Sequence, residues 1–208
     1  MPKTKNLNIN ISLTNSKLGD KIPSLNLPTT ICRADAPCKK GCYAKKGNWL
    51  FKNVVKCLDN NLNTFKENPS GFFDDIIQWL NDDDIMFRFF RWFSSGDIVN
   101  YEFFKGIVRT AKECPQTNFL CFTKKYEIVN DYIMFNGDLP SNLNVVFSNW
   151  GDFKPLNPYD LPTTHVKFKN PLLNVNIPEY AIPCKGSCKS CKACWSLKKG
   201  QSVYFDIH

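Results

Sequence analysis

The feature that most constrains this chain is a pair of cysteine clusters near its two ends. The clustered residues are Cys32, Cys38 and Cys42, followed by Cys184, Cys188, Cys191 and Cys194. With 43% hydrophobic residues and 17 Phe, a chain of 208 residues can build a packed core without disulfide staples. Dense thiols in a chain without a signal-peptide pattern are more often metal ligands than disulfide partners. Both clusters are therefore predicted to bind metal.

The spacing of the second cluster favours iron–sulfur over zinc. A structural zinc ion takes four tetrahedral ligands, usually from two Cys-x2-Cys pairs separated by a dozen or more residues. The second cluster instead follows the pattern Cys-x3-Cys-x2-Cys-x2-Cys, which suits a body of several metal atoms. We expect a [4Fe-4S] cluster here, with zinc as the alternative.

The first cluster offers only three thiols, which would leave one iron open to a cofactor or substrate. The alternative is a fourth ligand from elsewhere, and the candidates are Cys57, Cys114, Cys121 and Cys194. Cys57 and Cys121 lie on apolar faces of predicted elements and are interpreted as core residues. Seven clustered thiols are one short of two fully cysteine-ligated clusters. One cluster and two clusters are therefore both open interpretations.

The formal net charge of +8 has three interpretations: simple solubility, an anionic partner, or an anionic bound group. Lysines crowd both clusters, at Lys39, Lys40, Lys45, Lys46, Lys185, Lys189, Lys192, Lys198 and Lys199. Two four-iron clusters with four thiolates each, at about −2 apiece, would cancel roughly half of the excess. Nucleic acid is a possible partner that this pattern does not favour. No stretch approaches the length of a membrane span, and we expect a cytoplasmic protein with no membrane partner.

Strand and helix patterns alternate along what we interpret as a single domain, residues 1–208, with cluster-binding segments at 32–42 and 184–194. Strands are expected at 7–13, 24–32, 85–93, 118–122, 144–147, 165–168 and 203–207. Helices are expected at 49–65, at 73–80 behind a Ser70 cap, from an Asn100 cap to Glu113, and at 126–135; a polar turn is expected at 82–84. This order predicts the α/β class, as a partial (β/α) barrel with mostly parallel strands and cysteine-rich loops near both ends.

Polar residues follow the predicted strands at the ends where ligands bind in such sheets. These residues, which we expect to bind a cofactor, are Ser95, Gly96, Asp97, Lys124, Ser148 and Asn149. The competing interpretation of Asp97 is a carboxylate at a helix N-terminus, which contributes about 0.3–1 kcal/mol. Loop solvation is the corresponding alternative for Lys124, Ser148 and Asn149. His165 is interpreted as a hydrogen-bonded structural residue rather than a base, and His208 as a mobile terminal residue.

Several blocks of the chain resemble one family. The segment from Asn15 to Ala44 is similar to the opening of phage and prophage proteins named after gene product 88 of a mycobacteriophage. The blocks FRWFSSGD, CFTKK, FSNW and the closing cysteine run resemble later parts of it. That family looks like a relative of radical S-adenosylmethionine proteins, which fold as partial barrels.

The resemblance implies a cluster held by Cys32, Cys38 and Cys42, with S-adenosylmethionine as a further cofactor. Ser95-Gly96-Asp97 would match the motif that holds the methionine amino group. It also implies an electron donor as a partner and, for a phage-encoded protein, the cytoplasm of a bacterial host. The first cluster has the spacing Cys-x5-Cys-x3-Cys, whereas the spacing Cys-x3-Cys-x2-Cys usual in radical S-adenosylmethionine enzymes occurs at Cys184–Cys191.

Three classes of function follow from these patterns. The first is an enzyme that performs redox or radical chemistry at an open cluster iron. The second is a non-catalytic electron-transfer or cluster-stabilised protein. The third is a zinc-stabilised protein that binds nucleic acid through its lysines and aromatic residues.

Overall fold

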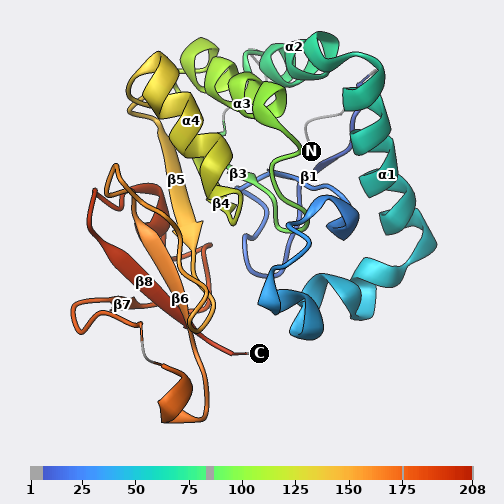
Figure 1. Ribbon diagram of the computed structural model, residues 1–208. Coiled ribbons are helices and arrows are strands. Elements are labelled where there is room, and N and C mark those ends of the chain that lie inside the picture. The colour runs from blue at the N-terminus through green and yellow to red at the C-terminus, as the bar shows by residue number, and fades with distance from the viewer. Residues whose placement is uncertain (1–6, 83–86, 175, 208) are drawn as a thin grey trace.

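The computed structural model describes residues 7–82, 87–174 and 176–207, and these form a mixed α/β fold around one sheet (Figure 1). The strands are β1 (Ile11–Ser12), β2 (Ser24–Leu25), β3 (Phe89–Trp92), β4 (Asn118–Thr123), β5 (Leu143–Ser148), β6 (Thr163–Lys167), β7 (Ile182–Pro183) and β8 (Ser202–Asp206). The α-helices are α1 (Lys52–Glu67), α2 (Pro69–Leu80), α3 (Tyr101–Glu113) and α4 (Tyr126–Asn136). Short 3-10 helices are η1 (Thr29–Ile31), η2 (Pro37–Gly41), η3 (Tyr43–Lys45), η4 (Gly47–Leu50), η5 (Pro171–Leu173) and η6 (Ala193–Trp195).

The eight strands run in the order β1-β2-β3-β4-β5-β6-β8-β7. Only β1 is antiparallel to its neighbour, and the other six pairings are parallel, as predicted. Within the described ranges β1 and β7 pair with one strand each, so the strand pairing leaves two open edges. The mostly parallel α/β prediction is therefore confirmed, and closure of the sheet toward a barrel is not.

The two faces of the sheet carry different layers because side chains alternate along each strand. On β4, Phe119 and Cys121 belong to the larger hydrophobic cluster, in which side chains of all four α-helices also take part. Leu120 and Phe122 face the other way, into a smaller cluster closed by Leu18, Ile22, Trp195, Leu197 and Val203. The helices thus cover one face, and the segment before β2 together with the C-terminal cysteine run covers the other (Figure 1).

Local sequence patterns predicted the positions of most helices and strands in the middle of the chain correctly. Asn100 caps α3, because its side chain accepts a hydrogen bond from the Phe103 amide at 2.9 Å. The strands β4, β5, β6 and β8 and the helix α4 lie within a few residues of their predicted positions. Part of the predicted 85–93 strand and of the 82–84 turn, at residues 83–86, lies outside the described residues, as does His208.

The structure corrects the predictions in several places, most of them in the first 80 residues. The strands expected at 7–13 and 24–32 pair over only two residues each, and a few residues after β2 the chain enters η1 rather than continuing as a strand. The helix α1 begins at Lys52 rather than Trp49, because residues 43–50 form η3 and η4. The cap of α2 is Asn68, whose side chain accepts from the Gly71 amide at 3.0 Å, and not Ser70. The short strand β7 was not predicted.

Candidate metal centre and the adjoining carboxyl edge

The first cysteine cluster and the predicted cofactor-binding residues lie at one edge of the sheet. The strands β2, β3, β4 and β5 are mutually parallel neighbours, so their carboxyl ends meet at this edge. The cysteine loop follows β2, Ser95-Gly96-Asp97 follows β3, Lys124 follows β4, and Ser148 ends β5 with Asn149 beside it. Ligands of open parallel sheets bind at this kind of edge.

The three thiols of the first cluster are near one another and half-buried. Burial, aided by the nearby charges of Asp97, Cys42 and Cys38, raises the pKa of the Cys32 thiol to about 11. The Lys124 ammonium acts on the same thiol in the opposite direction. These interactions place three thiols, a carboxylate and an ammonium group in one small region.

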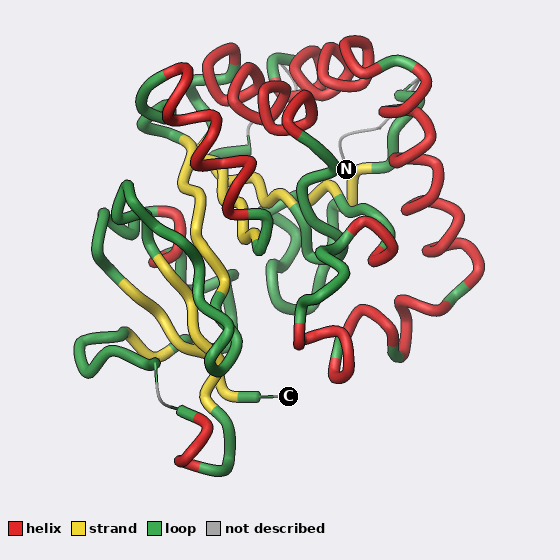
Figure 2. Tube along the Cα trace, in the orientation of Figure 1, coloured by secondary structure: helices red, strands yellow, loops and turns green. Residues whose placement is uncertain are grey.

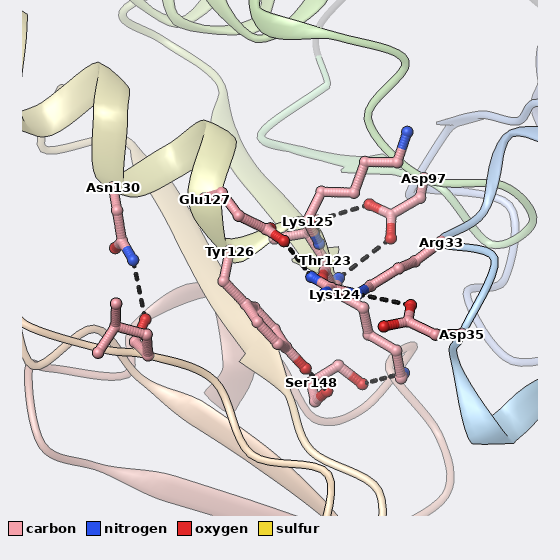
Figure 3. A network of polar contacts seen from close by, with 11 residues as sticks. Arg33, Asp35, Asp97, Thr123, Lys124, Lys125, Tyr126, Glu127, Asn130 and Ser148 are labelled. Carbon is pink, nitrogen blue, oxygen red and sulfur yellow. Dashed lines mark hydrogen bonds and ion pairs between the residues drawn. The ribbon is translucent and has the colours of Figure 1, made fainter.

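Arg33 anchors the cysteine loop to the start of α4 (Figure 3). Its Nε donates to the Asp35 carboxylate at 2.7 Å, and its Nη1 pairs with Glu127 and donates to the Lys124 carbonyl at 3.4 Å. The guanidinium also lies 5.9 Å from the centre of the Tyr126 ring. Sequence reasoning missed Arg33, because a single arginine inside a cysteine loop carries no local pattern that predicts its distant partners.

The Asp97 carboxylate is buried and hydrogen-bonded within the protein (Figure 3). Its Oδ1 accepts from Thr123 Oγ1 at 2.6 Å and from the Ile98 amide at 2.8 Å, and its Oδ2 accepts from the Lys124 amide at 3.0 Å. Burial raises its pKa, and these three donors oppose the rise. The interpretation of Asp97 as a simple helix-terminal charge is wrong, because α3 begins only at Tyr101 under the Asn100 cap and the carboxylate joins the ends of β3 and β4.

Ser95 and Gly96 tie the end of β3 to the segment after β2. The Leu27 amide donates to the Ser95 carbonyl at 3.0 Å, and Ser95 Oγ donates to the Leu27 carbonyl at the same distance. Gly96 has φ +87°, and a Cβ there would lie 2.7 Å from the Leu27 Cβ and 2.8 Å from its carbonyl oxygen. A glycine is therefore required at this position both by its backbone and by the close approach of Leu27.

The remaining predicted residues divide into two sets. Lys124 Nζ donates to Ser148 Oγ at 2.7 Å, so these two side chains meet across the ends of β4 and β5 (Figure 3). Asn149 instead contacts His165, with 3.4 Å between Nδ2 and Nδ1, and its Oδ1 is buried without a partner in the described residues. His165 is buried and also contacts Thr163 Oγ1 at 3.1 Å, which agrees with the predicted structural role.

The C-terminal thiols form a second group. Cys184, Cys188, Cys191 and Cys194 are half-buried. Burial, aided by the charges of the other three thiols, raises the pKa of the Cys194 thiol to about 12. The run is held by backbone bonds: the Cys188 amide donates to the Lys17 carbonyl at 3.0 Å, and the Cys184 amide to the Tyr204 carbonyl at 2.8 Å.

Arg91 is the principal charged side chain beside this second group. Its guanidinium lies 5.0 Å from the centre of the Phe122 ring, and its Nε is buried without a hydrogen-bond partner among the described residues. The ion pairs in the described ranges involve other residues. Its positive charge opposes the rise in the pKa of the Cys188 and Cys194 thiols that burial causes, and Lys17 acts on Cys188 in the same sense. The second group therefore lies in a positive environment.

Neither thiol group is arranged as a site for one ion. Across the described ranges, no three His, Cys, Asp or Glu side chains are placed so that they could hold a metal ion together.

Among the other cysteines, Cys121 and Cys114 are buried, which confirms Cys121 as a core residue. Cys57 is exposed on α1, so its assignment to the core is wrong: the buried stripe of this helix runs through Leu58, Asn61, Leu62 and Phe65.

The fold and this edge define the protein as a mixed α/β protein with a thiol-lined carboxyl edge on a mostly parallel sheet. The chain belongs to the gene product 88 family, whose model matches residues 3–168. The match includes the first cysteine cluster and all six predicted cofactor-binding residues, and it ends before the C-terminal cysteine run. No curated protein and no solved structure matches the chain. In the described part, none of the helices combines the length and the apolar character needed to cross a membrane.

Proposed function

We propose that this protein binds an iron–sulfur cluster through Cys32, Cys38 and Cys42, and that one iron stays open for a cofactor in the manner of radical S-adenosylmethionine proteins. The observation that carries the proposal is the grouping of these three thiols with Asp97 and Lys124 at the carboxyl edge of parallel strands. This proposal interprets the mostly parallel sheet as part of a (β/α) barrel with the cluster at its mouth.

The donor set fits such a group. The thiolates of a four-iron cluster bind different irons, so they are spaced by the body of the cluster rather than gathered around one ion. The three half-buried thiols would ligate three of the four irons and leave one open. Because burial raises the pKa of Cys32 to about 11, the metal-free loop holds that thiol protonated, and binding would release its proton. When bound, the cluster would supply one-electron chemistry at its open iron.

The neighbouring side chains have distinct roles in this proposal. Lys124 holds positive charge against the thiolates and is itself oriented by Ser148. A carboxylate offers about four acceptor positions, of which Asp97 uses three within the protein, so one is left for a cofactor amine. Gly96 lets the backbone approach without a side chain in the way. Arg33 fixes the loop that presents the thiols.

The C-terminal thiols are proposed to hold a second cluster, with four cysteines and no open iron. Arg91 and Lys17 supply positive charge beside them, which favours the thiolate form that binds iron. A single shared cluster with spare thiols is the alternative. Iron counts on Cys42→Ser and Cys188→Ser variants separate the two, because independent sites lose iron separately.

A non-catalytic electron-transfer protein is the second candidate function. It is favoured by the three internal hydrogen bonds of Asp97, which account for its burial without any cofactor. A zinc-stabilised nucleic-acid binder is a third, with less support, because zinc requires a four-ligand site around one ion.

Electron paramagnetic resonance of the reduced protein tests the proposal. S-adenosylmethionine should change the cluster signal of the unaltered protein, and Asp97→Asn should keep the iron but weaken this response. A signal that does not respond to S-adenosylmethionine in the unaltered protein would remove the cofactor claim and favour the electron-transfer function.

A further inference from the structure

The segment from η3 to the first turns of α1 exposes four large apolar side chains. Tyr43 is 50% exposed, Leu50 61%, Phe51 57% and Val55 39%. Further along α1 the apolar residues turn inward, and Leu58 and Leu62 are buried. Water contact with so much adjacent apolar surface is unfavourable, and such patches mark interaction sites.

An open hollow of about 490 Å³ lies within this surface. It is lined by Leu50, Lys52, Val55, Lys56, Asp59, Asn60 and Asn63. The hollow offers apolar contact from Leu50 and Val55 at its wall and charged or amide groups around it, which suits an apolar side chain of a protein partner.

The same segment is strongly basic. Between Asp35 and Asp59 there is no acidic residue and no arginine, and there are six lysines, which gives a formal charge of +6. The lysines are Lys39, Lys40, Lys45, Lys46, Lys52 and Lys56, and all but Lys39 are exposed. We call this region, residues 39–56, the lysine-rimmed patch.

The patch adjoins the first cysteine loop directly. Tyr43 follows Cys42 in the chain, and its hydroxyl donates a hydrogen bond to the Ser94 carbonyl at the end of β3. Its ring packs 6.3 Å from the ring of Trp49. Figure 2 shows this stretch as loop and short helical turns leading from the central strands to α1. A protein seated on the patch would therefore lie next to the candidate metal centre.

We propose that the lysine-rimmed patch docks a small acidic protein that carries single electrons. The inference rests on the proposed function, because an iron–sulfur cluster needs an electron donor. The docking site and the expected charge of the partner are inferred from the patch. Complementary charge steers such partners together, and an apolar centre limits where they seat. The exposed rings of Tyr43 and Phe51 offer stacking surfaces to a nucleic acid. The hollow itself is lined by the aliphatic Leu50 and Val55 and by no aromatic residue, which favours a protein side chain there.

Binding of two acidic carriers, a bacterial flavodoxin and a [2Fe-2S] ferredoxin, tests the proposal. At low salt at least one should bind, and the affinity should fall as salt rises. Leu50→Ser and Lys52→Glu should each weaken binding roughly tenfold. The matched controls are Met134→Ser, 60% exposed on α4, and Lys112→Glu on α3, and both should leave the affinity unchanged.

Three outcomes would overturn the docking claim: neither carrier binds at low salt, both patch variants bind as the unaltered protein does, or the patch variants instead abolish binding of an oligo-dT probe. Measuring protein with and without reconstituted iron separates this claim from the proposed function. Docking that depends on Leu50 and Lys52 in a protein that takes up no iron and sulfide would support the surface and overturn the proposed function.

Discussion

Asp97 shows how much of the carboxyl edge depends on single buried polar groups. It receives two backbone amides and one hydroxyl, from residues at the ends of two strands. The SSGD pattern was enough to predict that Asp97 follows a strand. Its hydrogen-bond partners could not be predicted, because Thr123 and Lys124 come close to Asp97 only when β3 and β4 pair. The same holds for Asn149, which the sequence placed with Ser148 and the structure directs toward His165.

Asp97→Ala should destabilise the protein far more than removal of a helix-terminal charge would. Three buried donors would lose their acceptor, and we expect a loss of about 2–4 kcal/mol in the free energy of unfolding. Asp97→Asn should cost less, because its Oδ1 can still accept. Denaturant unfolding of metal-free protein measures both, with the exposed Asp131→Ala as the control, expected within about 0.5 kcal/mol of the unaltered protein. A loss for Asp97→Ala as small as that of the control would contradict the role of the carboxylate.

His165 should make stability depend on pH. Burial, aided by the charge of Lys154, lowers its pKa from the ordinary value of 6.5. The unfolded chain therefore takes up a proton before the folded protein does, and stability is lost as pH falls from about 6.5 through the folded pKa. Unfolding followed between pH 5 and pH 8 (roughly one unit or more on each side of an unperturbed histidine) should show this loss, and His165→Gln should reduce it. If the free energy of unfolding of His165→Gln changed with pH as steeply as that of the unaltered protein, the pH dependence would come from other groups.

At the scale of elements, the helical layer depends on close contact between α2 and α3. Gly106 on α3 leaves no room for a side chain, because a Cβ there would lie 2.1 Å from the ring of Phe73 on α2. Phe73 in turn packs against Phe103, with 5.1 Å between ring centres. The ring cannot move aside without disturbing this aromatic cluster.

Gly106→Ala should therefore destabilise the protein by about 1–3 kcal/mol, despite the better helix propensity of alanine. Gly41→Ala is the matched control, since a Cβ at Gly41 meets nothing within 4 Å. Thermal unfolding of the two variants compares them directly. Equal melting temperatures for both would mean that α2 and α3 are packed less closely than the structure has them.

Elements with strong local signals were predictable, and elements made by tertiary pairing were not. The helix α3 has a capping Asn100 and an apolar face of period 3.6, and both are properties of a short sequence window. The strand β7 is two residues long and exists only because Ile182 and Pro183 pair with Val203 and Tyr204. The apolar spacing of the predicted helix at 49–65 does not bring all of its apolar residues into the core: Phe51 and Val55 are exposed. Periodicity shows a face of a helix without showing what covers it.

At the scale of the whole molecule, the sequence predicted the mostly parallel sheet and the gathering of polar residues at its carboxyl edge. It could not predict that the C-terminal cysteine run covers the face opposite the helices, where Trp195 Nε1 donates to the Phe90 carbonyl at 3.1 Å. That contact joins residues 105 positions apart, and no local pattern specifies it. Arg91, whose Nε has no hydrogen-bond partner in the part of the chain that the structure describes, was missed for the same reason.

The most direct test of the central claim is the iron and acid-labile sulfide content of protein purified without oxygen. The proposal predicts iron and sulfide in equal amounts, at about four of each per cluster. Cys42→Ser should lose the part held by the first cluster, and Leu50→Ser, a surface change nearby, should lose none. Stoichiometric zinc with no sulfide in the unaltered protein would contradict the proposed cluster and leave the thiols to a zinc site.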